Sequence, residues 1–135
     1  MTTYNYDKEV DILYISFSGE KATTAVELND NILLRFNRLE KRAIGLTLMD
    51  FSVLIQLTHL GPRTFPLIGL TALEPDWQET VIEIITKPPV KKILKVSVYT
   101  PSLTETVPVA LVEQSPHKPI VDIQLPNEAV LLRHA

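Results

Sequence analysis

The sequence contains no cysteine, and its first 61 residues contain no proline. The absence of cysteine excludes disulfide bonds, thiol catalysis and thiolate metal sites. Only four glycines are present and they lie far apart, so there is no glycine-rich phosphate loop. No apolar run approaches the length of a membrane span, and the N-terminus has no basic stretch followed by an apolar one. These absences predict a cytoplasmic protein that does not bind a membrane.

Excess charge of either sign is also missing, because 13 basic residues face 16 acidic ones. Proteins that bind nucleic acid usually carry a basic surplus or stripe, so we expect no nucleic-acid partner. The one basic cluster is Lys91, Lys92 and Lys95, which we interpret as the solvated start of a strand. The three histidines are scattered and none has metal-ligand spacing. We therefore predict no metal and no cofactor.

What the first half does contain is a repeated alternation of apolar residues. It occurs in four runs, at residues 12–17, 23–28, 32–36 and 43–49. Side chains of a strand point to opposite faces with a period of two, so each run can present one apolar face to a core. The gaps between the runs are short and polar, as in antiparallel neighbours. The pattern predicts a four-stranded antiparallel meander.

The first strand is preceded and entered by Tyr-Asp-Lys-Glu-Val-Asp-Ile-Leu-Tyr-Ile at residues 6–15. This run resembles the Tyr-Asp-x-Glu-x-Asp-x-Leu-Tyr-Ile signature of a small bacterial domain family of unknown function. Segments 26–33 and 44–50 resemble its other two blocks in the same order, so the resemblance covers about residues 4–50. One departure is Asn31 where such families often have glycine, and asparagine also tolerates left-handed backbone.

The resemblance implies the meander fold and a cyanobacterial type of architecture, but it implies no activity. Genes of such small domains sometimes accompany toxin-like partners, so the resemblance also suggests an antitoxin-like role.

Composition changes near residue 61, because all ten prolines lie between Pro62 and Pro126. Proline deletes a ladder donor, so the second half is expected to hold loops, helix starts and edge strands. Residues 74–86 predict an amphipathic helix that begins at Pro75 and ends before Pro88. Its apolar arc is expected to cover the meander, with Glu79 and Glu83 opposite. The arc comprises Trp77, Val81, Ile82, Ile84 and Ile85.

The other segments of the second half are weaker. Residues 51–58 suit a helix capped by Ser52 or a strand about equally. Further strands are predicted at 93–99, 106–112, 120–125 and 128–133, mostly at sheet edges. Residues 93–97 resemble residues 12–16, which fits either a decayed duplication completing the sheet or chance similarity of amphipathic strands. The predicted fold is a single α+β domain over residues 1–135, a meander (4–50) followed by a helix and a proline-rich β extension (51–135).

The most enzyme-like feature is the acidic trio Asp7, Glu9 and Asp11. In an extended chain the three carboxylates would lie on one side and could bind a hard cation or a small molecule. The alternative is a polar turn between strands at 4–7 and from Ile12, in which aspartate oxygens accept backbone amides. With the nearby Tyr6 and Tyr14, the trio is the candidate functional cluster; no residue is assigned a catalytic role.

Tyr14 falls on the face of the predicted sheet opposite the core, together with Ile12 and Leu33, and with Met49 and Tyr99 as potential neighbours. Such a face is too apolar for solvent alone and calls for C-terminal strands or a second subunit. We therefore expect a non-enzymatic interaction or regulatory module, acting as a homodimer or with another protein. The alternative function is a small-molecule-binding protein or hydrolase that uses the acidic trio.

Overall fold

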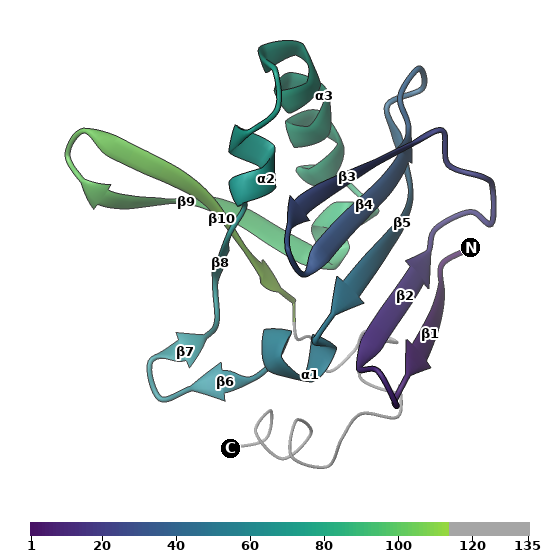
Figure 1. Cartoon of the computed structure of the whole chain (residues 1–135), viewed down its shortest axis with the longest axis horizontal. Helices are drawn as coiled ribbons and strands as arrows, with labels where there is room; N and C mark the ends of the chain where they lie inside the picture. Colours follow the sequence, from purple (N-terminus) through teal and green to yellow (C-terminus); the bar gives the residue numbers. More distant parts are fainter. Residues whose placement is uncertain (114–135) are drawn as a thin grey trace.

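A five-stranded antiparallel sheet forms the centre of the protein in the computed structural model, which describes residues 1–113 (Figure 1). Its order is β1-β2-β5-β4-β3, so β3, β4 and β5 follow one another while β2 lies beside β5. The α+β class, the N-terminal meander and the first short strand are confirmed, and the strands expected at 120–125 and 128–133 lie outside the described residues. The strands are β1 (Thr3–Asp7), β2 (Ile12–Ser16), β3 (Thr24–Asn29), β4 (Ile32–Asn37) and β5 (Arg42–Met49).

The inner face of this sheet is the core of the molecule. Alternate residues of neighbouring strands are in register there, for example Leu13 opposite Leu48 and Leu34 opposite Leu46. The fully buried side chains of this face are Leu13, Ile15, Leu28, Ile32, Leu34, Phe36, Leu46 and Leu48. The outward residues alternate with them, which is why the pattern was visible in the sequence.

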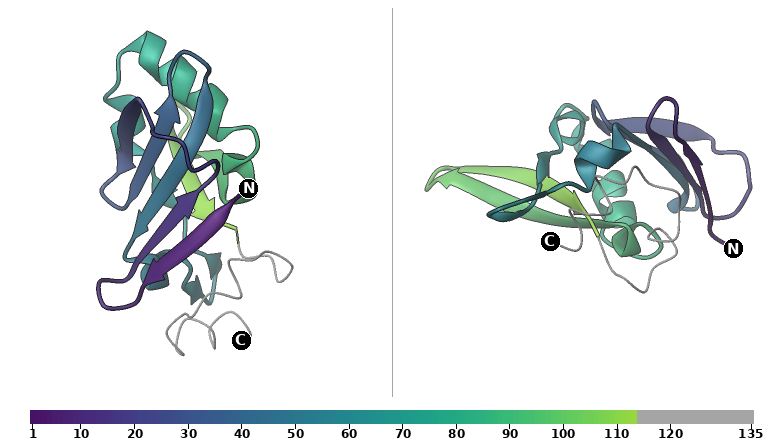
Figure 2. Two further views of the ribbon diagram at one scale, coloured as in Figure 1. Left: turned by 90° about the vertical axis from the view of Figure 1, so that its right-hand side faces the viewer. Right: turned by 90° about the horizontal axis from the view of Figure 1, so that it is seen from below.

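Helix α3 (Pro75–Ile85) covers the inner face, as the predicted amphipathic helix was expected to do (Figure 2). Val81, Ile84 and Ile85 are buried against the sheet. The expectation for Ile82 was wrong, because its side chain is exposed. Successive helix residues are 100° apart, so Ile82 is turned about 100° from Val81 and about 160° from Ile84, which places it at the rim of the buried arc.

Trp77 begins the buried stripe of α3 and lies at its margin. Its ring meets Phe36 edge-on, with the ring centroids 6.3 Å apart. The guanidinium of Arg38 lies 3.8 Å from the centroid of the indole. The indole is half-buried, packed on the core and capped by a cation. The indole thus connects α3 to Phe36 on the inner face of the sheet.

Short elements connect the sheet to α3: α1 (Phe51–Leu54), β6 (Leu57–Thr58), β7 (Gly61–Pro62), β8 (Phe65–Pro66) and α2 (Ile68–Thr71). Residues 51–58 thus contain a helical turn and a short strand. Ser52 lies inside α1, so its predicted role as N-cap was wrong; the cap position is Asp50, in left-handed conformation with φ of 55°. Helix α2 packs on β3, where Gly69 leaves no room for a Cβ beside the carbonyl oxygen of Glu27.

The chain continues through η1 (Val90–Lys92) into a hairpin of β9 (Leu94–Ser102) and β10 (Glu105–Val112). These strands form a separate three-stranded sheet of order β8-β10-β9. Strand β9 therefore does not complete the five-stranded sheet, contrary to the duplication hypothesis. The distal half of the hairpin extends away from the body of the protein (Figure 1). None of the helices within residues 1–113 is long and apolar enough to span a bilayer.

Candidate functional site

The acidic trio lies in the turn between β1 and β2. Asp7 Oδ1 accepts a 3.1 Å hydrogen bond from the backbone N–H of Glu9, and both residues are exposed. Asp11 closes the turn in left-handed conformation, with φ of 56°. Aspartate tolerates this conformation better than most residues because its short side chain bonds locally to backbone amides. The geometry is that of the polar turn, with aspartate oxygens accepting amide hydrogens.

The carboxylate of Asp11 is the centre of the polar contacts at this end of the sheet. Oδ1 accepts 2.7 Å and 3.0 Å hydrogen bonds from the Tyr6 hydroxyl and the Ser52 backbone N–H. Oδ2 accepts a 2.6 Å bond from the Ser52 hydroxyl, and the carbonyl of Asp11 accepts from the N–H of Phe51 at 3.0 Å. Asp11 thus satisfies free N–H groups at the start of α1, as an N-cap side chain would.

Tyr6 lies on the inner face of the sheet, with its ring 5.8 Å from that of Phe51. Burial raises the pKa of Tyr6 above its ordinary value, and the hydrogen bond to Asp11 raises that pKa further. The phenol therefore stays protonated and donates to the carboxylate. Burial also raises the pKa of Tyr4 on the same strand. These tyrosines belong to the packing of β1 on the core.

The structure divides the candidate cluster. Tyr6 and Asp11 are in direct contact, while Tyr14 lies on the opposite face of the sheet. Within residues 1–113 no three His, Cys, Asp or Glu side chains form a group able to hold a metal ion, so Asp7, Glu9 and Asp11 do not converge in that way.

The outer face of the sheet carries Tyr14 together with Ile12, Leu33 and Met49. Ile12 is in register with Met49, and Thr47 of β5 lies between Tyr14 and Leu33. Tyr14 is 40% exposed and the other three side chains are partly buried. Helices α2 and α3 lie on the other side of the sheet (Figures 1 and 2). We call these four side chains the outer apolar patch.

Tyr99 is not part of this patch, so its suggested place beside Tyr14 was wrong. It lies on β9, in the other sheet, and is 59% exposed. Both residues lie in alternating segments of the sequence, but strand pairing over long separations decides which strands share a face.

Arg35, a residue that the sequence reasoning missed, lies on the same outer face. Its side chain crosses β5 over Gly45, and Nη2 donates a 3.4 Å hydrogen bond to the carbonyl of Ile15. Its Nε is buried without a hydrogen-bond acceptor, and among residues 1–113 the guanidinium has no ion pair. One signal was present in the sequence: a cation at an outward position of an otherwise apolar strand.

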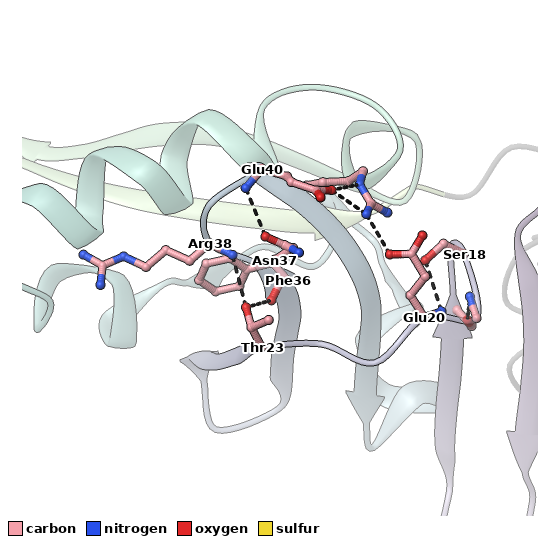
Figure 3. Close-up of polar contacts among 10 residues, drawn as sticks. Ser18, Glu20, Thr23, Phe36, Asn37, Arg38 and Glu40 are labelled. Carbon is pink, nitrogen blue, oxygen red and sulfur yellow. Dashed lines mark hydrogen bonds and ion pairs between the residues drawn. The ribbon is translucent and has the colours of Figure 1, made fainter.

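The opposite end of the sheet holds a second polar cluster, in the loops beside β2 and β5 (Figure 3). Arg42 bonds Glu20 at 2.7 Å and Glu40 at 2.6 Å, and these hydrogen bonds raise the pKa of Arg42. Thr23 Oγ1 accepts a 3.3 Å bond from the N–H of Arg38, whose guanidinium points away from the loop (Figure 3). Exposed ion pairs of this kind contribute little stability, so the cluster serves to order two loops.

Residues 3–52 match a family described as "Protein of unknown function (DUF2283)". The matched segment runs from β1 into α1 and includes both ends of the Asp11–Ser52 link. Neither a curated protein nor a solved structure matches the chain. The match supports an uncharacterised small domain family for this part of the chain and assigns it no activity.

Proposed function

We propose that this protein is a non-enzymatic interaction module that acts as a homodimer and holds a protein partner on the outer face of its five-stranded sheet. The observation that carries the proposal is the position of Arg35 beside the outer apolar patch, where its guanidinium has no ion pair within residues 1–113. Apolar area and arginine together are typical of the centre of protein interfaces.

The charge of Arg35 defines the chemistry of the partner. A guanidinium on a half-apolar surface interacts strongly with a carboxylate because neighbouring apolar atoms exclude water from the pair. Among residues 1–113 no carboxylate is paired with Arg35. We therefore expect a partner segment that presents an Asp or Glu flanked by apolar side chains, the latter covering Tyr14 and Leu33. An antitoxin-like role, in which the partner is a toxic protein, is one version of this proposal and is suggested by the family resemblance.

The geometry favours this function over a hydrolase or small-molecule-binding protein built on the acidic trio. A general base needs a carboxylate that is free to accept a proton from a substrate or from water. Both oxygens of Asp11 already accept bonds from Tyr6 and Ser52, and Asp7 accepts from the backbone of Glu9. The Asp7 bond stabilises the turn and the Asp11 bonds connect this turn to α1, so we assign both carboxylates a structural role.

Two measurements test the proposal. Light scattering of the purified protein should give about twice the 15.2 kDa mass of one chain. A tagged protein should also retain a partner from a native extract, and the partner, once identified by mass spectrometry, is purified and titrated. Because the Arg35 charge is central, Arg35→Glu should weaken this binding at least about a hundredfold. Arg35→Lys should weaken it less, since it keeps the charge but loses the planar fork.

Lys8→Glu is the matched control, because it reverses a charge on the exposed β1–β2 turn without touching the outer face. It should leave the affinity unchanged. Equal binding by Arg35→Glu and the unmodified protein would remove the outer face as the binding surface. A mass of one chain at all concentrations would contradict the homodimer.

A further inference from the structure

Strand β9 of the β9–β10 hairpin carries no charged residue from Val96 to Ser102. Every residue from Ser97 to Thr106 is exposed, including Val98 at 65% and Tyr99 at 59%. Strand β8 pairs with β10 only at Val109 and Ala110. No described strand pairs with the outer edge of β9. An isolated two-stranded hairpin is marginal in water, so this ribbon gains stability from any strand that joins it.

Natural proteins protect such edges with charged residues, prolines and bulges. On β9 the protecting residues stand only at the two ends of the exposed segment, Lys95 before it and Pro101 after it. Residues 96–100 between them, Val-Ser-Val-Tyr-Thr, carry no charge and contain three β-branched side chains and one tyrosine. These residue types favour strand pairing. The unprotected length is therefore five residues, with a barrier at each end.

We propose that two copies of this chain join through β9, with the two strands antiparallel about a two-fold axis at Val98. This inference rests on the proposed homodimer and names its surface. The occupant of the edge is a second copy because the pairing is self-complementary. Val98 then faces its own counterpart, Ser97 faces Tyr99, and Val96 faces Thr100. Such cross-strand pairs of β-branched and aromatic side chains are stabilising.

The same register also avoids repulsion. The two-fold axis at Val98 places Lys95 opposite Pro101 of the second copy, so the two Lys95 ammonium groups are kept apart. Like charges directly opposite each other would oppose pairing. Lys95 of each copy thus lies opposite Pro101 of the other copy, and residues 96–100 of the two copies pair with one another. The isologous arrangement is also the usual one for homodimers.

The surface beside β9 supports the same placement. A groove of about 490 Å³ lies between the ribbon and the helices, lined by Val96, Val98 and Pro108 on one side and by Leu70 and Ile82 on the other. Residues opposite each other in a sheet share a face, so a strand added to β9 places its own Val98 and Thr100 on the groove side. The exposed Ile82 lines the helix wall of the same groove. Pairing thus extends an apolar surface that already exists.

Five paired residues bury less area than a standard stable interface, so we expect a dimer that dissociates on dilution. Cysteine cross-linking tests the geometry directly, because the chain has no cysteine of its own. Directly opposite residues of antiparallel strands have Cα atoms about 4.5–5.5 Å apart, within the range of a disulfide. The full-length Val98→Cys variant should therefore form a covalent dimer under mild oxidation, and a thiol reductant should reverse it.

Leu103→Cys is the matched control on the same ribbon. Leu103 is fully exposed at the hairpin tip. In the proposed register the two copies of residue 103 lie ten residues apart along the strands, or roughly 33 Å. Random collision would cross-link this cysteine at least as fast as the one at position 98. Preferential cross-linking at position 98 supports the interface, and equal or faster cross-linking at position 103 overturns it.

A second pair of variants tests the interface without disulfide chemistry. Val98→Lys places two ammonium groups opposite each other and should raise the concentration at which half the protein is dimeric at least tenfold. Leu103→Lys, equally exposed, should not change it. Light scattering over a dilution series reports both. A dimer that persists unchanged in Val98→Lys overturns the β9 interface but leaves the homodimer intact. If the unmodified protein is a monomer at every concentration, both the β9 interface and the homodimer are overturned.

Discussion

The Ser52 hydroxyl donates a 2.6 Å hydrogen bond to Oδ2 of Asp11, a residue 41 positions earlier in the chain. The contact joins the β1–β2 turn to the helical turn that follows β5. Because the backbone N–H of Ser52 also donates to this carboxylate, one side chain connects two segments that come together only when the sheet is complete. These bonds give the Asp11 carboxylate a structural role, the connection of the β1–β2 turn to α1.

The first prediction concerns Asp11. Asp11→Ala removes the acceptor for three donors and places alanine in left-handed backbone, so it should lower the free energy of unfolding by about 2–4 kcal/mol. Asp11→Asn should cost less, since asparagine tolerates the conformation and keeps one oxygen. Urea denaturation measures both changes. Glu9→Ala, in the exposed part of the turn, is the control and should be nearly silent.

Metal analysis of the same proteins, purified without chelator, separates a structural role from a metal site. We expect no stoichiometric divalent metal held by Asp7, Glu9 and Asp11. A metal that is present in the unmodified protein and lost in Asp11→Ala would contradict the structural interpretation.

The second prediction is a loss of stability in alkali. The pKa of Tyr6 is raised in the folded protein, while in the unfolded chain it has its ordinary value near 10. Above pH 10 the unfolded state therefore loses the phenolic proton first and binds fewer protons than the folded state. Stability must fall as pH rises through this range. Tyr6→Phe should reduce the slope above pH 10 and should cost about 1–2 kcal/mol at neutral pH.

Tyr14→Phe is the control for this titration, because Tyr14 lies on the outer face, away from Asp11. Thermal melts between pH 8 and pH 11 provide the comparison. An unchanged alkaline slope in Tyr6→Phe would show that another group, such as Tyr4, determines it.

The strands of the sheet could be predicted because each is buried on one side only, which leaves a period-two pattern in the sequence. The neighbour of β2 could not, since its pairing with β5 depends on contacts some 30 residues apart that no local pattern records. Ile82 shows a finer limit. Its apolar side chain fitted the predicted arc, but its position around the helix axis places it in the groove beside β9.

The candidate site was predictable to a similar extent. The turn alternative for Asp7 and Asp11 followed from residue type, because aspartate bonds to nearby amides. The contribution of Ser52 was not visible, since it depends on the tertiary position of α1. Arg35 was also missed, because the space that accommodates it comes from Gly45 on the neighbouring strand.

The third prediction concerns Gly69. A Cβ at this position would collide with the carbonyl oxygen of Glu27, which is backbone and therefore held by the sheet. Gly69→Ala should displace α2 from β3 and lower stability by more than about 2 kcal/mol. Gly19→Ala is the comparison, because nothing lies within 4 Å of its Cβ and only the positive φ of 75° opposes it. That variant should cost about 1 kcal/mol, and equal losses would show that α2 adapts.

The fourth prediction is that the protein does not bind nucleic acid at physiological salt. The formal net charge is −3, and Lys91, Lys92 and Lys95 form a small exposed cluster at the start of β9. Three lysines would neutralise only a few phosphates, and binding through so few contacts is weak and salt-sensitive. An electrophoretic shift of mixed-sequence DNA or RNA at sub-micromolar protein in near-physiological salt would contradict this.

The last prediction is that Trp77 anchors α3 to the sheet. Its indole lies edge-on against Phe36 and beneath the guanidinium of Arg38, so Trp77→Ala removes both contacts and opens the margin of the core. Truncation of a large aromatic typically costs about 3–5 kcal/mol. We expect a value near the lower end because the indole is only half-buried. Glu79→Ala, on the exposed side of the same helix, should be silent. Glu83→Ala loses an exposed 3.3 Å ion pair with Lys41 and should cost less than about 1 kcal/mol.

Trp77 is the only tryptophan, so its fluorescence reports this site directly. Emission should be blue-shifted in the folded protein and should move toward that of free indole on unfolding. Arg38→Ala should change the emission while leaving the fold intact, because it removes only the cation above the ring. If native emission already matches free indole and Trp77→Ala melts like the unmodified protein, then α3 is held by Val81, Ile84 and Ile85 alone. In that case the indole would be available to a partner, and the helix would replace the sheet as the surface to test.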